Sequence, residues 1–230
     1  MQVKKAVVIL SGGLDSTTCV GVAQHAGFEI YALTFDYGQR HSIEIEAAKK
    51  VATFYEVRQH RIAQLPFLHS IGGSALTDDD IEVPHTGIVE DEIPVTYVPG
   101  RNLIFLSIAT AYAEVVGAEA IYLGVNALDY SGYPDCRPEF IQAFAKTASL
   151  ATKVGVMGTP LEIMTPLLDL SKAEIITLGT SLGVPYVLTA SCYEGQEVAC
   201  GVCDSCRLRL KGFKEAGVRD PIVYARLFTC

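Results

Sequence analysis

Residues 11–16 read SGGLDS and follow a short apolar run, KKAVVIL, that is rich in β-branched side chains. Adjacent glycines let backbone N–H groups come close to an anion, and the start of a following helix adds partial positive charge. The stretch therefore predicts a loop that holds an anionic group. Asp15 lies within this loop, and its carboxylate would repel such a group unless a cation lay between them.

A second group of residues that could do chemistry is a cluster of cysteines near the C-terminus. Four of the seven cysteines fall within 15 residues, at Cys192, Cys200, Cys203 and Cys206. A C-x2-C step lets two thiolates reach one tetrahedral ion, and Gly201 eases the turn between them. Four sulfur ligands leave no open position, so the pattern predicts one structural zinc ion. An iron–sulfur centre and a redox C-x-x-C pair are the alternatives.

The elements that must position these groups alternate between strand and helix. We expect strands at 4–10, 28–35, 57–63, 119–125 and 161–166, and helices at 16–26, 42–56, 102–117, 137–152 and 171–183. Apolar strands separated by helices predict a parallel sheet covered on both faces. Ser171 and Glu174 fit a capping box, and Gly183 fits a helix stop. In such sheets, ligands bind at the carboxyl ends of the strands, where SGGLDS is expected.

The pattern also predicts the domain organisation. Residues 1–185 form the expected α/β domain, with residues 64–100 as an insertion or lid. Residues 186–230 form a small zinc-binding module with a C-terminal helix. That helix carries three basic residues, Arg207, Arg209 and Lys211. We expect them to form a solvated face; the alternative is a contact to nucleic acid.

Charge and composition exclude several classes of protein. A formal net charge of −8 disfavours bulk binding to nucleic acid, so we expect no direct nucleic-acid partner. No apolar run reaches the roughly 18 residues of a membrane helix, so we expect no membrane partner. The start of the chain lacks the cleavage site of a signal peptide, and clustered thiols suit a reducing compartment, so we expect a cytoplasmic protein.

SGGLDS lacks the Lys-Ser/Thr pair of the common mononucleotide loop and the spacing of the dinucleotide fingerprint. It resembles the SGGxDS signature of the PP-loop ATP pyrophosphatases, which cleave ATP between its α and β phosphates. The resemblance implies a Rossmann-like, adenine nucleotide alpha-hydrolase-like fold. Because pyrophosphate needs Mg²⁺ to neutralise its charge, we expect Asp15 to hold this ion directly or through water, with a simple helix cap as the alternative role. The resemblance also implies that Lys172, in DLSKAEI, contacts the phosphates. The implied ATP-binding residues are Leu10, Ser11, Gly12, Gly13, Leu14, Asp15, Ser16, Thr17, Thr18, Cys19 and Val20.

Three further stretches narrow the resemblance: TFDYGQRH (34–41), VPGRN (98–102) and SGYPDCRPEF (131–140). With SGGLDS and the cysteines, they are similar to the 7-cyano-7-deazaguanine synthase family of queuosine biosynthesis, over about residues 5–216. This resemblance implies that 7-carboxy-7-deazaguanine is adenylated by ATP, converted by ammonia to the amide, and activated by a second ATP to give the nitrile.

Candidate residues for the substrate follow from the same stretches. Arg101 and Arg137 could hold a phosphate or the substrate carboxylate through paired hydrogen bonds, and we take Arg101 as catalytic with Asp15 and Lys172. The substrate residues are expected to be Arg101, Asn102, Asp135 (or Glu139) and Arg137. Asp36 and Arg40 would lie beside the ATP site, and His41 could move a proton from ammonium or only donate a hydrogen bond. Cys136 is expected to be a packing residue and not a nucleophile.

Other functions stay open at this point. A different PP-loop enzyme, such as a tRNA thiolase or lysidine synthetase, would need an RNA surface or sulfur-carrying cysteines. An amidotransferase-type synthetase for NAD, GMP or asparagine would have to use free ammonia or ammonia from a partner, because the sequence shows no glutaminase signature. A zinc module that binds nucleic acid without catalysis would leave SGGLDS and Lys172 without a role. The apolar helix at 102–116 offers a surface for a homodimer.

Overall fold

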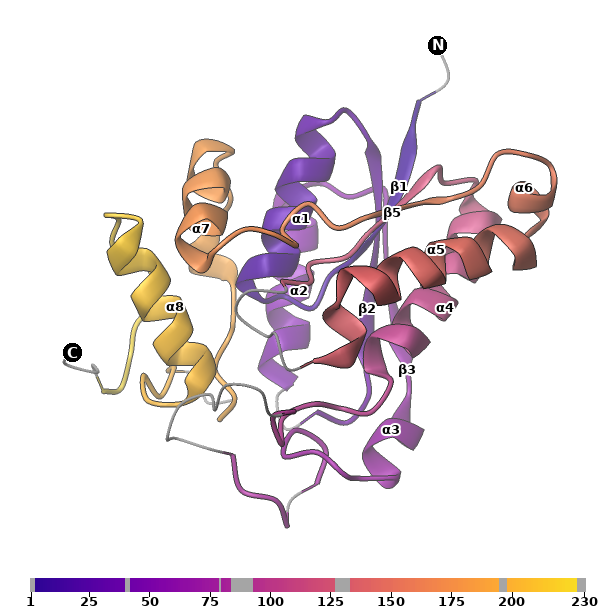
Figure 1. The fold of residues 1–230 in the computed structure, drawn as a ribbon. Coiled ribbons are helices and arrows are strands. Elements are labelled where there is room, and N and C mark those ends of the chain that lie inside the picture. Colours follow the sequence, from indigo (N-terminus) through magenta and orange to yellow (C-terminus); the bar gives the residue numbers. More distant parts are fainter. Residues whose placement is uncertain are drawn as a thin grey trace.

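The computed structural model describes residues 3–39, 42–78, 80–83, 93–126, 133–194 and 198–226. Its centre is a parallel sheet of five strands in the order β3-β2-β1-β4-β5 (Figure 1). The strands are β1 (Lys5–Ile9), β2 (Glu29–Asp36), β3 (Gln59–Gln64), β4 (Ala120–Tyr122) and β5 (Glu162–Met164).

Helices connect the strands and cover both faces of the sheet. They are α1 (Leu14–His25), α2 (Ser42–Phe54), α3 (Pro66–Ser70), α4 (Arg101–Val116), α5 (Pro138–Ala151), α6 (Lys153–Val156), α7 (Lys172–Ser181) and α8 (Asp204–Glu215), with short 3-10 turns at Pro134–Cys136 and Tyr186–Leu188. Among the helices of the described residues, none is long and apolar enough to cross a membrane.

Alternation along β1 shows why the sheet is covered on both faces. Val7 and Ile9 pack into a core that includes α4 and α5, whereas Ala6 and Val8 pack into a second core with α1, α2 and α7. Successive side chains of a strand point to opposite faces, so a fully apolar strand needs a helix layer on each side. Figure 1 shows these two layers on either side of the sheet.

The strand order places the SGGLDS loop where the order of the strands reverses. The chain moves outward from β1 to β2 and β3, and then crosses through α4 to β4 on the other side of β1. The carboxyl ends of β1 and β4 therefore flank the position where the order reverses, which is where open α/β sheets bind ligands. This arrangement confirms the predicted Rossmann-like fold class.

The predicted elements are present, with shifted bounds. The capping box of Ser171 and Glu174 is formed, and Gly183 has a positive φ just after α7. The helices α3 and α6 were not predicted, because they have only five and four residues, too few for a periodic pattern. Pro66 begins α3, where a missing N–H has little cost.

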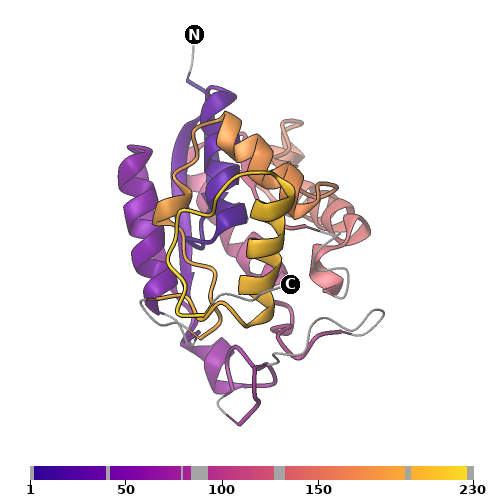
Figure 2. The same ribbon diagram turned by 90° about the vertical axis from the view of Figure 1, so that its left-hand side faces the viewer.

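The C-terminal segment packs against the sheet domain. Phe213 of α8 joins the core formed with α1 and α7, and its ring lies 5.5 Å from that of Tyr186. Gly212 lets α8 approach α7, because a Cβ there would lie 2.4 Å from Cγ of Lys172. Figure 2 shows α8 in front of the sheet and next to α7. The domain boundary near residue 185 stays a prediction.

Candidate active site and metal centre

A cavity opens at the carboxyl ends of β1, β2 and β4. Its walls also include the first turns of α1, α2, α4 and α7, residues of α8, and Ala190, Ser191 and Tyr193 of the cysteine-rich segment. Among the residues predicted to act in the site, Leu10, Ser11, Gly13, Leu14, Asp15, Ser16, Arg101, Asn102 and Lys172 line this cavity. Residues that are up to 162 positions apart in the sequence thus share one space.

The SGGLDS loop leads directly into α1, which begins at Leu14. Gly13 is the N-cap and offers no capping side chain, so the N–H groups of the first turn are available to an anion. Gly12 has a φ of +87°, and a Cβ there would lie 2.2 Å from the carbonyl oxygen of Glu44. Both the backbone conformation and the close approach of α2 therefore require glycine at this position.

The most informative contact in the cavity joins Asp15 to Lys172. The Lys172 ammonium lies 2.8 Å from both carboxylate oxygens of Asp15. The side chains are only 9 % and 20 % exposed, so the pair is shielded from water. Lys172 is the first residue of α7 and Asp15 lies in the first turn of α1, where the helix dipole favours a negative charge.

Gly124 shapes the same corner and was not predicted. It follows β4, and a Cβ there would lie 3.0 Å from the backbone nitrogen of Ser16 and 3.1 Å from the carbonyl carbon of Asp15. A side chain at Gly124 would press against the first turn of α1, so glycine allows the segment after β4 to approach α1 this closely. A glycine just after an apolar strand was the available signal in the sequence.

The far end of the cavity is aromatic and carries Arg101. Its guanidinium donates a hydrogen bond to the Tyr37 hydroxyl at 3.4 Å. Phe35 and Phe105 stack beside them, with ring centroids 3.9 Å apart. A flat heterocycle with an acidic substituent would find apolar ring contacts and a permanent cation here.

The two stretches VPGRN and SGYPDCR meet at the start of α4. The Asp135 carboxylate accepts a hydrogen bond from the Asn102 backbone N–H at 2.8 Å, and the Asn102 side chain donates to the Asp135 carbonyl oxygen at 3.2 Å. Burial raises the pKa of Asp135. Gly100, the N-cap of α4, has no side chain, so Asp135 supplies the missing cap from a distant segment.

Other predicted residues lie outside the cavity or outside the described part of the chain. Thr17, Thr18, Cys19 and Val20 are fully buried within α1. Arg137 is exposed, as is Glu139. Arg40 and His41 are outside the described residues. The roles proposed for these side chains remain predictions.

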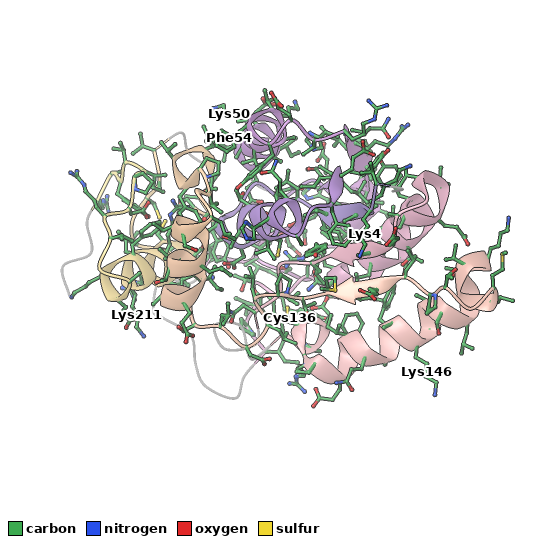
Figure 3. All side chains as sticks on the ribbon, turned by 90° about the horizontal axis from the view of Figure 1, so that it is seen from above. Lys4, Lys50, Phe54, Cys136, Lys146 and Lys211 are labelled. Carbon is green, nitrogen blue, oxygen red and sulfur yellow. The ribbon has the colours of Figure 1, made fainter. Side chains whose placement is uncertain are left out.

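Cys136 borders the cavity as a buried thiol. Its sulfur accepts a hydrogen bond from the Asn102 side chain at 3.3 Å. Burial raises the pKa of Cys136 to about 12, so the nucleophilic thiolate is scarce at neutral pH. Figure 3 shows Cys136 toward the middle of the molecule, whereas Lys146 and Lys211 lie at its edge. The thiol therefore suits packing, in keeping with its expected role.

Glu44 also lines the cavity, although the sequence did not single it out. It lies in the first turn of α2 and is partly exposed. Burial raises the pKa of Glu44 to about 7, although the nearby Arg101 cation acts in the opposite direction. Nothing in SIEIE distinguishes Glu44 from Glu46, which is exposed and pairs with Lys49.

The four predicted cysteines converge on one point. Their sulfur atoms all lie within 4.8 Å of one another, and Cys200 Sγ is 4.0 Å from Cys206 Sγ. With metal–sulfur bonds of about 2.3 Å, tetrahedral sulfur ligands lie about 3.8 Å apart. Backbone N–H groups of Val202 and Cys203 donate to the Cys200 sulfur at 3.4 Å, which would stabilise a thiolate. The cluster therefore fits a structural metal site, and Gly201 makes the expected turn with a φ of +78°.

Arg209 connects this segment to the wall of the cavity. Two of its nitrogens donate to the Asp220 carboxylate at 2.8 and 2.9 Å, and Nη1 donates to Thr189 at 2.6 Å and to Ser191 at 3.3 Å. The side chain is 2 % exposed, so the expected solvated face does not include Arg209. Helical periodicity turns this residue toward the core, beside Phe213, where its charge is paired.

Comparison with known proteins now gives the family. Residues 5–217 match the family model described as "Queuosine biosynthesis protein QueC". The chain belongs to this family. It is 62% identical to a protein of Saccharophagus degradans over 98% of this chain and all of that protein, and 61% identical to one of Oceanobacillus iheyensis over 97% and 100%. Both QueC relatives are named 7-cyano-7-deazaguanine synthase, which supports the predicted family over another PP-loop enzyme.

Solved structures that resemble this QueC-family chain support the fold alone. The NMN synthetase of Francisella tularensis has a TM-score of 0.51 and 17% identity, covering 94% of this chain and 79% of its own. A 4-thiouridine synthetase, solved with RNA and bound ATP, has a TM-score of 0.52 and 19% identity, covering 93% and 50%. Proteins with different named activities thus share this architecture, so the function must be argued from the site.

Proposed function

We propose that this chain converts 7-carboxy-7-deazaguanine and ammonia into 7-cyano-7-deazaguanine, with ATP giving AMP and pyrophosphate. The observation that carries the proposal is a single cavity with two different ends. One end holds the SGGLDS loop and Lys172, which suit a triphosphate. The other holds Arg101 among aromatic rings, which suits a flat heterocycle with a carboxylate.

The reaction follows from placing these two ligands end to end. The substrate carboxylate attacks the α-phosphorus, and pyrophosphate leaves with the bonding electrons toward the loop. Ammonia then displaces AMP from the acyl adenylate and forms the amide. A second ATP adenylates the amide oxygen with release of pyrophosphate and one N–H proton to solvent, and loss of AMP and the second N–H proton leaves the nitrile. The protein contributes position and charge, because N–H groups of α1 and the Lys172 cation face the leaving pyrophosphate.

Magnesium is proposed to accompany ATP, with Asp15 as its protein ligand. A carboxylate oxygen is the ligand type that Mg²⁺ prefers, and the ion would neutralise phosphate charge. In the structure the Lys172 ammonium pairs with the Asp15 carboxylate, so the negative charge of Asp15 beside the loop is compensated. This pairing offers a reason for an acidic residue in a phosphate-binding loop.

Replacing Asp15 with asparagine should separate nucleotide binding from turnover. We expect Mg-ATP turnover to fall by about 10²-fold or more, because the metal loses its carboxylate ligand. Binding of ATP without Mg²⁺ should be as tight as in wild type or tighter, because Lys172 is no longer held by a carboxylate. Calorimetry with and without Mg²⁺ measures both effects, and full Mg-ATP turnover in the variant would remove Asp15 from the metal role.

We propose that the four-cysteine site binds zinc. Four thiolates in a closed tetrahedral set suit Zn²⁺ and leave no position for substrate, so the role is structural. We also place the protein in the cytoplasm. No cysteine in the described part of the chain forms a disulfide, which suits a reducing compartment.

We propose that the chain forms a homodimer. Exposed apolar side chains gather on α4, α5 and α6 and just after α6: Val115, Leu150, Val156 and Met157 are 70–84 % exposed. The backbone N–H of Val154 donates to the Glu114 side chain at 3.2 Å, so α6 lies against α4. Light scattering tests this assembly directly, because a solution mass of one chain would exclude it.

A product assay tests the function itself. Purified protein is mixed with Mg-ATP, an ammonium salt and 7-carboxy-7-deazaguanine, and both nucleotides and the base are followed by mass. AMP together with the nitrile is the expected result. AMP without nitrile would keep the ATP chemistry and discard the acceptor, and no AMP would discard the proposal.

A further inference from the structure

The carboxylates that line the cavity have different partners. Asp15 is held by Lys172, at 2.8 Å from both of its oxygens. Among the residues that the structure describes, Glu44 forms no side-chain hydrogen bond or ion pair, although it borders the same cavity. Glu44 is partly exposed and lines the cavity, so its carboxylate is open to a ligand that brings its own hydrogen-bond donors.

The position of Glu44 limits what that ligand can be. The first turn of α2 lies against the phosphate loop, since a Cβ on Gly12 would lie only 2.2 Å from the Glu44 carbonyl oxygen. The Glu44 side chain also interacts electrostatically with Arg101 and Tyr37 at the other end of the cavity, so it lies between the two ends. In the proposed end-to-end arrangement, this is where the α-phosphate of the nucleotide meets the substrate carboxylate. In the proposed reaction, the acyl carbon that receives nitrogen is joined to that phosphate through one oxygen. Glu44 is therefore beside the reacting centre and not at a remote edge of the base.

Resting on the proposed function, we propose that Glu44 binds the ammonium ion and accepts its proton before nitrogen attacks the acyl adenylate. Ammonia is mostly protonated at neutral pH, so the enzyme must bind a small cation and remove one proton. The carboxylate at Glu44 provides the opposite charge and an acceptor oxygen. Lys172 and Arg101 line the cavity as cations and cannot serve this purpose.

In this step protons move to Glu44 and nitrogen replaces AMP on the acyl carbon. Ammonium gives one proton to the Glu44 carboxylate and becomes ammonia. The nitrogen lone pair forms a bond to the acyl carbon, the bond from that carbon to the AMP oxygen breaks, and its electron pair leaves with AMP. Glu44 returns its first proton to solvent and then accepts the second proton from nitrogen, which gives the neutral amide; this proton also passes to solvent.

The electrostatic surroundings agree with this role. Burial raises the pKa of Glu44 to about 7, so both protonation states are accessible at neutral pH. Arg101 on α4 lowers it, Cys192 on the cysteine-rich segment raises it, and Tyr37 after β2 lies within the same electrostatic cluster. A group that exchanges a proton during turnover needs such a balance.

Glu44→Gln separates this step from adenylation. Exchange of labelled pyrophosphate into ATP, dependent on 7-carboxy-7-deazaguanine and measured without ammonium, should stay within a few-fold of wild type. Nitrile formation with ammonium should fall by about 10²-fold, and KM for ammonium should rise at least about tenfold. Glu46→Gln is the matched control, because Glu46 is on the same helix but exposed and paired with Lys49, and it should match wild type.

Three results would overturn the inference. They are an unchanged KM for ammonium, a raised KM for the base alone (which would make Glu44 a reader of the heterocycle), or a loss of pyrophosphate exchange comparable to the loss of nitrile. Retained exchange also shows that the variant is folded. If wild-type protein itself neither exchanges pyrophosphate with this acid nor makes nitrile, the proposed function fails, which is a different outcome from failure of Glu44 alone.

Discussion

Lys172→Met should lower ATP turnover by about 10²- to 10³-fold, the range seen when one preorganised charge-stabilising group is removed. The substitution deletes the cation that faces the phosphate loop. It also exposes incoming phosphates to Asp15, whose charge Lys172 balances at 2.8 Å. Both effects act in the same direction, so the loss should appear in kcat as well as in KM for ATP.

The fold of this variant should be retained. Methionine keeps most of the aliphatic chain that packs against Gly212 of α8. The remaining Asp15 carboxylate stays in the first turn of α1, where the helix dipole compensates part of its charge. Thermal unfolding and pyrophosphate release, measured on the same sample, separate a lost charge from a lost fold.

Two further variants show whether charge is the cause. Lys49→Met removes a lysine of an exposed ion pair on α2 and should leave turnover unchanged. In the double variant Lys172→Met with Asp15→Asn, binding of Mg-free ATP should recover part of the affinity lost in Lys172→Met, because the repulsive carboxylate is gone. Normal turnover in Lys172→Met would place this lysine outside the reaction.

The sequence predicted the parts of the site that are encoded locally. SGGLDS contains its own glycines and helix start, and Ser171 with Glu174 forms its cap within four residues. The cysteine cluster is similar, because Cys200, Cys203 and Cys206 lie within seven positions of one another. In each case the spacing along the chain already sets the spacing in space.

Contacts between distant segments could not be predicted in this way. The pairing of Asp15 with Lys172 spans 157 positions, and the capping of α4 by Asp135 spans 33. Both contacts depend on the order of the strands, because α1, α4 and α7 all begin on the side of the sheet where the strands have their carboxyl ends. Glu44 shows the limit most clearly. It differs from Glu46 only in the direction in which the helix points its side chain.

Loss of the metal should disable the active site as well as the C-terminal segment. The cysteine cluster, α8 and the wall of the cavity form one continuous set of contacts. Arg209 of α8 donates to Ser191, which adjoins Cys192, and the Ala190 N–H donates to the Gly12 carbonyl oxygen at 3.0 Å. Removing the metal therefore releases the segment that packs against the phosphate loop.

Cys203→Ser tests this coupling, and elemental analysis of wild type should first show one zinc per chain. Zinc-finger peptides gain roughly 10–16 kcal/mol of apparent binding energy from their metal. If even about 3 kcal/mol is lost here, the thermal midpoint should fall by about 6–12 °C for a chain of this size. ATP turnover should fall with it, because α8 no longer holds Lys172 through Gly212.

Cys136→Ser is the matched control for metal content. It also changes a buried cysteine to serine, but outside the cluster, and should keep one zinc per chain. Limited proteolysis then locates the damage. In Cys203→Ser, trypsin should cleave after Lys211 and Lys214 of α8 while the sheet domain resists, because most residues of the two main cores lie before residue 185. An absence of zinc in wild type, or a brown iron-bearing protein, would contradict the zinc assignment. Full turnover by metal-free protein would show that the phosphate loop is held without the cysteine cluster.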